Sequence, residues 1–166
     1  DLRGKILILS RDAYADQPIT GGYISGWSFA EEGTTDAKIT SRVATGVLGV
    51  QDYYHVEKPE VKVKAVSDFM DWAADNASKN AWTINHTSGY TGTIGSDSSI
   101  KQNAENNNVA LYDYLTDSSR PCGSTGIILL DHAGVRSSGS YDIYGDLLPQ
   151  AIIDNNFAFQ LRLKGE

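Results

Sequence analysis

The chain has 166 residues, and its 21 acidic residues against 14 Lys and Arg give a formal net charge of −7. That length suffices for one domain with a hydrophobic core. The acidic balance argues against a nucleic-acid partner, because surfaces that bind nucleic acid are usually basic. No apolar run approaches the roughly 18 residues of a membrane span, and the single Cys122 excludes an intrachain disulfide framework and a Cys-rich metal site.

The amino terminus leads from Asp1–Lys5 directly into an apolar run, without the pattern of a signal peptide. We therefore expect the sequence to begin inside a domain, either because a longer precursor is cut here or because it is one part of a longer protein.

Four apolar runs predict strands: Ile6–Leu9, Val43–Val50, Ala81–Ile84 and Gly126–Leu130. The first and last are continuous rather than alternating, which predicts strands buried on both faces, as in a parallel sheet covered by helices. The second run contains Gly46 and Gly49, which predict a bulge or a bend.

Helical patterns lie between and after these runs. One begins near Lys58 with Pro59 in its first turn, a second covers Ser99–Leu115, and a third begins near Asp146 and is expected to end at Asn155-Asn156. The alternation of strands and helices predicts βα units. The segment Asp12–Arg42 is expected to be a long functional loop, rich in Gly and aromatic residues, and the alternation in Phe157–Lys164 is that of an additional strand.

Polar residues follow the predicted strands where each one ends: Arg11, Asp52, Asn85 and Asp131. In parallel α/β folds, ligand-binding and catalytic groups gather at the carboxyl ends of the strands. These four residues are therefore candidates for one site.

Each candidate has a functional and a structural interpretation. Asp131 either orients a catalytic His, as the third member of many triads does, or holds a loop. Arg11 either binds a phosphate or carboxylate or pairs with a nearby acid. Asp52 with Tyr54 suits a polyol, because a carboxylate accepts hydrogen bonds from hydroxyls while a Tyr ring covers the apolar face of a sugar. The alternative is that Asp52 and Tyr54 simply share one side of a strand end.

The three histidines, His55, His86 and His132, lack the close spacing of metal ligands. We therefore expect no metal site in this chain.

Several segments resemble those of bacterial phosphatidylinositol-specific phospholipases C, in one order along most of the chain. Arg3–Arg11 resembles their Arg-Gly-Lys-Ile-Val-Leu strand, and Val50–Val56 resembles their Val-Gln-Asp-x-Tyr segment. Trp82–Ser88 is similar to their Ile-Asn-Phe-Thr-Ser strand. Gly126–Asp131 resembles the last barrel strand, and Leu147–Asn156 resembles the final helix.

The resemblance implies an α/β fold: the second half of an irregular TIM-type barrel, with parallel strands alternating with helices. Residues 1–166 would form the carboxyl-terminal half of the catalytic barrel, the first half lying outside this chain. In the family, the inositol 2-hydroxyl attacks phosphorus, giving a cyclic inositol phosphate and diacylglycerol. The general base and general acid are a His pair, and an Arg or, in some members, Ca²⁺ stabilises the phosphate; these groups lie on the first half.

Carried over by this resemblance, Asp131 orients the base His, while Arg11, Asp52 and Tyr54 bind and stack on inositol. Two residues depart from the pattern: His86 stands where the family often has Phe, and His132 directly follows Asp131. No cofactor is implied for this chain, although Ca²⁺ is an option for the complete protein.

The resemblance also implies a secreted or extracytoplasmic protein that acts on phosphatidylinositol in a membrane surface. A half barrel leaves strand edges to be paired by the upstream half or by a second copy, so this chain alone should be inactive. Two alternatives stay open: a non-catalytic polyol- or glycan-binding relative of the same barrel, and an unrelated α/β glycan-binding protein.

Overall fold

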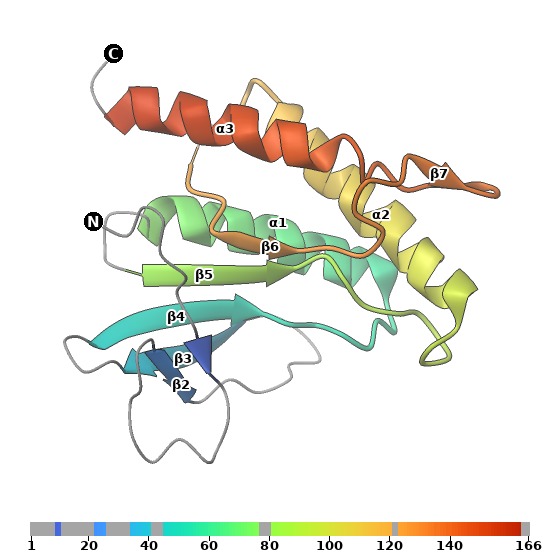
Figure 1. The fold of residues 1–166 in the computed structure, drawn as a ribbon, viewed down its shortest axis with the longest axis horizontal. Helices are drawn as coiled ribbons and strands as arrows, with labels where there is room; N and C mark the ends of the chain where they lie inside the picture. The colour runs from blue at the N-terminus through green and yellow to red at the C-terminus, as the bar shows by residue number, and fades with distance from the viewer. Residues whose placement is uncertain are drawn as a thin grey trace.

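The computed structural model describes residues 9–10, 22–25, 34–40, 45–76, 81–120 and 123–163. Within these ranges, six strands form one sheet in the order β1-β2-β3-β4-β5-β6, and three helices lie on one of its faces (Figure 1). The strands are β1 (Leu9–Ser10), β2 (Gly22–Ser25), β3 (Thr34–Thr40), β4 (Thr45–Gln51), β5 (Ala81–His86) and β6 (Ile127–Leu129). The helices are α1 (Pro59–Asn76), α2 (Asp97–Thr116) and α3 (Leu148–Leu163), and a small second sheet pairs β7 (Ser137–Ser138) with β8 (Tyr141–Asp142).

The predicted α/β class, with parallel strands alternating with helices, is confirmed in β4, β5 and β6. These strands pair in parallel, and α1 and α2 connect them in sequence. Both helices begin within two residues of the predicted positions, α1 at Pro59 as expected, and α2 ends one residue beyond the predicted Leu115. A parallel pair needs such a crossover, so the carboxyl ends of all three strands meet at one edge of the sheet.

The prediction of a long loop over Asp12–Arg42 is wrong. This segment contains β2 and β3, which pair antiparallel with each other, and β3 also pairs antiparallel with β4 from Thr34↔Gln51 to Thr40↔Thr45. The sequence of β3 is rich in β-branched residues, which favour strands. It contains no apolar run, however, so the apolar pattern of the sequence does not predict it.

The carboxyl-terminal prediction is also wrong. Helix α3 continues through Asn155-Asn156 to Leu163, so Phe157–Lys164 contributes no strand in the described chain. The two Asn side chains connect the helix to the segment before β6: Asn155 Nδ2 donates to Gly123 O at 2.7 Å, and Thr125 Oγ1 donates to Asn156 Oδ1 at 3.3 Å. These tertiary hydrogen bonds outweigh the modest helix propensity of Asn.

The predicted bulge at the glycines of β4 is replaced by a close approach of α1. Gly49 pairs regularly with Asp36 and Thr83. A Cβ atom at Gly49 would lie 2.4 Å from the ring of Trp72, which stacks on Phe69. The glycine is therefore required so that α1 can pack directly on the strand.

The two faces of the sheet differ in what covers them. On the helix side, Val66, Met70, Leu111 and Leu148 form a buried cluster, and Ile128 and Leu130 pack against it. On the opposite face, Ile24, Leu48, Val50 and Ile84 form a second cluster.

The expected burial of Gly126–Leu130 on both faces is wrong, because Ile127 is 38% and Leu129 40% exposed. Within the described ranges β6 pairs only with β5 and β1 only with β2, so that part of the chain does not close a barrel. No other described element therefore covers the exposed side chains of Ile127 and Leu129 in β6. None of the helices in the same ranges has the length and apolar character needed to cross a bilayer.

Candidate active site at the carboxyl ends of the parallel strands

A cavity of about 460 Å³ lies at the carboxyl ends of β4, β5 and β6. Its lining residues are Asp52, Tyr54, His86, Ser88, Leu129, Leu130 and Asp131. Three of the four site residues predicted from the sequence, Asp52, Tyr54 and Asp131, are thus brought together. The fourth, Arg11, lies outside the described residues.

Asp52 and His86 form a polar part of one wall. β4 and β5 pair in parallel with Gln51 opposite Asn85, so the next residues, Asp52 and His86, are neighbours at the strand ends. Asp52 Oδ1 lies 3.7 Å from His86 Nδ1, with both side chains largely buried. His86 Nδ1 is also 3.3 Å from Ser88 Oγ. The sequence marked His86 only as a departure from the family pattern, whereas the strand register makes it part of the cavity.

Asp131 is held from two sides. Its Oδ2 accepts the Gly89 N–H at 3.1 Å, and its backbone O accepts from Asn108 Nδ2 at 3.2 Å. The next residue, His132, has a φ of 57°, in the left-handed region that few non-glycine residues adopt. Strained backbone of this kind concentrates at functional sites.

An aromatic cluster borders the cavity next to Asp52. Tyr54 is 42% exposed and meets the Tyr90 ring edge-on, with centroids 5.2 Å apart, while Tyr90 stacks on His55 at 4.9 Å. Two backbone hydrogen bonds fix the segment: Tyr90 N–H donates to Tyr54 O at 3.1 Å, and Val56 N–H donates to Tyr90 O at 2.9 Å. The Tyr54 ring is thereby placed at the rim, where it can cover a flat apolar surface of a ligand.

Asn85, the remaining polar residue at a strand end, faces the helices and not the cavity. Its Oδ1 accepts from Gln51 Nε2 at 2.8 Å, and its Nδ2 donates to Val66 O at 3.0 Å. Asn85 is therefore a structural residue that fastens β5 to β4 and α1.

Helix α2 supports the cavity through buried asparagines. Asn103 Nδ2 donates to Thr87 O at 2.9 Å, Thr87 Oγ1 donates to Asn108 Oδ1 at 3.0 Å, and Asn107 Nδ2 donates to Asn103 O at 2.9 Å. Buried polar groups need such partners, and these bonds fix the segments that follow β5 and β6. They also explain why α2 is less apolar than α1.

Behind the cavity lies a residue that the sequence analysis did not single out. Lys62 of α1 is fully buried. Burial lowers its pKa from the ordinary 10.5 to about 7, against the attraction of Asp52 and Asp131, which raises it. A Lys flanked by valines in an amphipathic helix gives no signal of burial in the sequence.

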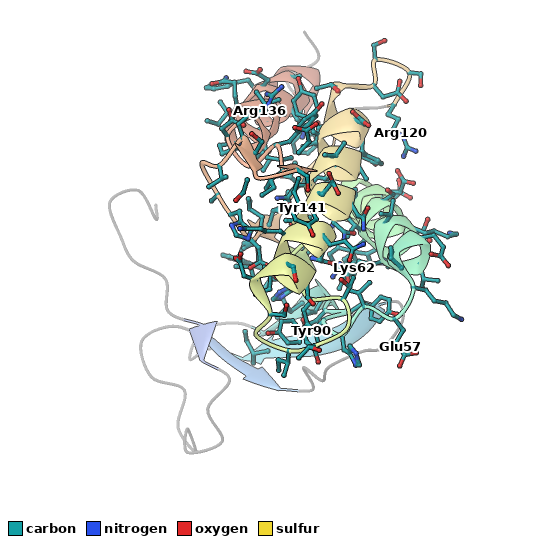
Figure 2. All side chains as sticks on the ribbon, turned by 90° about the vertical axis from the view of Figure 1, so that its right-hand side faces the viewer. Glu57, Lys62, Tyr90, Arg120, Arg136 and Tyr141 are labelled. Carbon is teal, nitrogen blue, oxygen red and sulfur yellow. The ribbon has the colours of Figure 1, made fainter. Side chains whose placement is uncertain are left out.

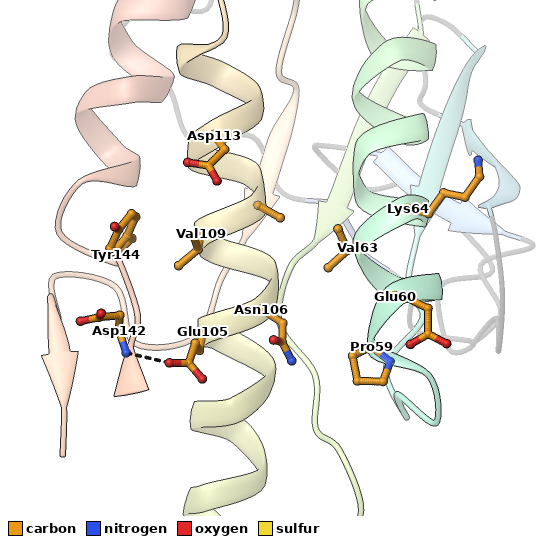
Figure 3. Close-up of a pocket in the computed structure, with 11 residues that line it drawn as sticks. Pro59, Glu60, Val63, Lys64, Glu105, Asn106, Val109, Asp113, Asp142 and Tyr144 are labelled. Atoms are coloured by element: carbon orange, nitrogen blue, oxygen red, sulfur yellow. Dashed lines mark hydrogen bonds between the residues drawn. The ribbon is translucent and has the colours of Figure 1, made fainter. Parts of the chain in front are cut away.

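A larger cavity, of about 800 Å³, lies on the helix layer between α1 and α2 (Figure 3). Acidic side chains surround it, and one of them, Glu105, accepts the Asp142 N–H through Oε1 at 3.1 Å. None of the predicted site residues lines it. We assign the candidate site to the smaller cavity because the two carboxylates and the aromatic rim converge there.

The described residues contain no group of three or more His, Cys, Asp or Glu side chains placed to hold a metal ion. The chemistry that the smaller cavity offers is hydrogen-bond acceptance by Asp52 and Asp131 beside an aromatic surface. This combination suits the hydroxyls and ring face of a polyol.

Comparison with solved structures identifies proteins of the same fold. One is a mutant of phosphatidylinositol-specific phospholipase C from Staphylococcus aureus, with a TM-score of 0.60 and 25% identity over 82% of this chain. The chain resembles a phosphatidylinositol-specific phospholipase C. A pentafluoro-Phe variant of the same enzyme matches with a TM-score of 0.57 and 26% identity over 79% of this chain. No protein-family model and no curated protein matches the sequence.

The resemblance predicted from the sequence motifs is therefore confirmed. The chain spans 42% of the first of these phospholipases and 40% of the second, in agreement with the predicted half of a TIM-type barrel. The likeness supports a related fold, and the activity and the roles of the individual residues belong to the proposal below.

Proposed function

We propose that this chain supplies the inositol-binding and His-orienting part of a phosphatidylinositol-specific phospholipase C. The observation that carries the proposal is the convergence of Asp52, Tyr54 and Asp131 on one cavity at the carboxyl ends of three neighbouring parallel strands. Asp52 would accept hydrogen bonds from inositol hydroxyls, and Tyr54 would stack on the ring, with Arg11 joining them. Asp131 would hold the general-base His in the correct tautomer.

In this mechanism the inositol 2-hydroxyl oxygen forms a bond to phosphorus while the bond from phosphorus to the diacylglycerol oxygen breaks. The base His takes the hydroxyl proton, and a second His donates a proton to the leaving oxygen. An Arg, or Ca²⁺ held elsewhere in the complete protein, would stabilise the phosphate charge. Asp131 acts on the first step because its carboxylate stabilises the imidazolium that forms.

The upstream half of the barrel is the partner that we propose for the uncovered surface. β6 has no second neighbour among the described strands, and Ile127 and Leu129 are exposed beside that edge. On α3, the helix that follows, Ile153 is 46% and Phe157 67% exposed. Exposed apolar groups next to an open strand edge are typical of an interface that another part of the barrel covers.

A membrane surface is the proposed location of the substrate. The loop that follows β5 carries Ile94, which is 67% exposed, and Tyr54 is exposed at the cavity rim. Apolar and amphipathic side chains around a lipid-binding cavity favour contact with the bilayer interface. One of the solved relatives comes from work on the modulation of membrane binding by the S. aureus enzyme. A secreted or extracytoplasmic location fits this proposal.

The test is turnover by the natural full-length protein on vesicles that contain phosphatidylinositol, followed by phosphorus NMR. The proposal predicts that the lipid phosphodiester resonance declines while a cyclic inositol phosphate appears, and that phosphatidylcholine vesicles stay unchanged. If the protein binds myo-inositol without turning over the lipid, the non-catalytic polyol-binding alternative replaces it. If the protein neither binds myo-inositol nor turns over the lipid, both the proposed function and the polyol-binding alternative are rejected.

A further inference from the structure

Lys62 is among the largest fully buried side chains in the described part of the chain. It extends from α1 into the interior between the helices and the sheet (Figure 2). Burying an ammonium group is unfavourable unless partners compensate for the lost hydration. A fully buried Lys beside a candidate active site therefore needs an explanation.

The contacts of Lys62 lead to the end of β4. Its Nζ donates to Tyr53 O at 2.8 Å and to Gln51 Oε1 at 3.2 Å. Gln51 Oε1 also accepts the Tyr53 N–H at 2.8 Å. Both the backbone N–H and the backbone carbonyl of Tyr53 are thus held by hydrogen bonds on the helix side of the sheet.

Tyr53 stands between the two residues proposed to bind the ligand. Asp52 and Tyr54 both line the cavity, whereas Tyr53 is buried on the helix side, where its hydroxyl accepts the Glu57 N–H at 3.0 Å. A shift of the Tyr53 peptide would therefore move both cavity residues together.

The network also reaches the neighbouring strand. Gln51 Nε2 donates to Asn85 Oδ1 and to His86 O, each at 2.8 Å. One buried cation is thus linked, directly or through Gln51, to the backbone of Tyr53 and of His86, at the ends of both β4 and β5.

We propose that Lys62 is a positioning residue for the cavity: from behind the sheet it holds Asp52 and Tyr54 in the geometry that receives a polyol. This inference deepens the proposed function and rests on it for the identity of the ligand. The positioning itself rests on the hydrogen bonds alone.

The charge of Lys62 adds a second contribution. Asp52 at the end of β4 and Asp131 after β6 both attract the ammonium, and His86 at the end of β5 is the other titratable group at the same strand ends. Since its pKa is about 7, the ammonium loses its proton near neutral pH. A neutral amine keeps two N–H donors for the two acceptors, so the positioning persists at high pH while the attraction to the carboxylates fades.

The experiment compares Lys62→Met with Lys64→Met in the natural full-length protein. Met keeps most of the length of the side chain, being one atom shorter, and removes the donor. Lys64 lies two residues further along α1, is 74% exposed and pairs with Asp68, so its variant is a control for the lost charge. Two quantities are measured: backbone amide exchange, and the affinity for myo-inositol by calorimetry.

Lys62→Met should accelerate exchange of the Tyr53, Val56 and Tyr90 amides about 10-fold or more and weaken myo-inositol binding about 10-fold, as expected for the loss of a hydrogen bond from a charged donor. The Leu111 amide in α2 should change less than about two-fold, and Lys64→Met should change neither quantity. Unchanged exchange near Tyr53, or an equal acceleration everywhere, would overturn the inference. So would unchanged inositol affinity despite faster local exchange.

Two further outcomes are covered: a wild-type protein that does not bind myo-inositol, and a Lys62→Met variant that does not fold. If the wild-type protein does not bind myo-inositol, the proposed ligand is wrong, while the exchange data still decide whether Lys62 positions Tyr53. If Lys62→Met does not fold, carbon NMR of the wild-type Lys62 side chain replaces it. Titration near pH 7, with simultaneous shifts of the Tyr53 and Tyr54 amides, supports the inference. Titration of the Lys62 side chain without simultaneous shifts of those amides overturns it.

Discussion

Replacing Asp131 by Asn tests the most specific catalytic role in this account. The change is isosteric and removes one negative charge. Gly89 N–H donates to Asp131 Oδ2 at 3.1 Å, and an Asn oxygen can accept the same bond. The other side-chain atom then becomes an NH₂ group, which would face the general-base His with a donor where the carboxylate offers an acceptor.

The expected loss of kcat follows from this replacement of an acceptor by a donor. A His held by a carboxylate donates its N–H to it, whereas a His facing an amide donor is driven to the other tautomer and also loses the stabilisation of its imidazolium form. In a triad the equivalent change lowers kcat by about 10⁴. We expect a loss of roughly 10² to 10⁴ in kcat, within the range of general acid–base catalysis. KM should change little, because the carboxylate is proposed to face the His rather than the inositol.

The assay is steady-state release of cyclic inositol phosphate from phosphatidylinositol vesicles by the full-length protein. Asp142→Asn is the matched control, because Asp142 is exposed at the larger cavity between α1 and α2 and its replacement removes the same charge. Denaturation curves of both variants would establish that the fold persists. A kcat of Asp131→Asn near that of the wild type would refute the reasoning and reduce Asp131 to a residue that holds the Gly89 loop.

Three other changes test the candidate site and the residues that support it. Asp52→Ala should raise KM for phosphatidylinositol about 10-fold or more, since a hydrogen bond to the bound ring is lost; an effect on kcat alone would contradict that role. Gly89→Ala should destabilise the fold by about 1–3 kcal/mol in urea denaturation, because its φ is +153° and its Cβ would lie 2.8 Å from Tyr54 O; wild-type stability would argue against the strain. Between pH 7 and 10.5 the unfolded chain should bind one more proton than the folded chain at Lys62, so stability should rise with pH in that window. Lys62→Met should lose this slope, and equal slopes in both proteins would show that Lys62 does not titrate as proposed.

Apolar periodicity was sufficient to predict the elements that are strongly apolar. β4, β5 and β6 overlap three of the four predicted apolar runs, and α1 has an amphipathic pattern with Pro59 at its start. Placing Asp52 and Asp131 at strand ends then followed from the parallel topology. Local pattern and global fold agree in this part of the chain.

The failures arise where long-range contacts decide the structure. β3 is stabilised by pairing along its length with β4, which a polar sequence does not indicate. In α3, the Asn155 and Asn156 side chains bond to Gly123 and Thr125, partners that are distant in sequence. Tertiary hydrogen bonds of this kind override local propensity.

In the candidate site, too, some residues could be predicted from the local sequence and others depend on long-range contacts. Asp52, Tyr54 and Asp131 were predictable because they follow shortly after the ends of predicted strands. Lys62 was not, since its burial depends on acceptors at Gln51 and Tyr53 that only the folded chain supplies.

The most direct test of the central claim is to map the binding of myo-inositol to the full-length protein by chemical-shift perturbation. The account predicts saturable shifts centred on Asp52, Tyr54, His86 and Asp131, the residues around the smaller cavity. Shifts centred instead on the groove between α1 and α2, or none at saturating ligand, would contradict the assignment of a polyol site to the ends of the parallel strands.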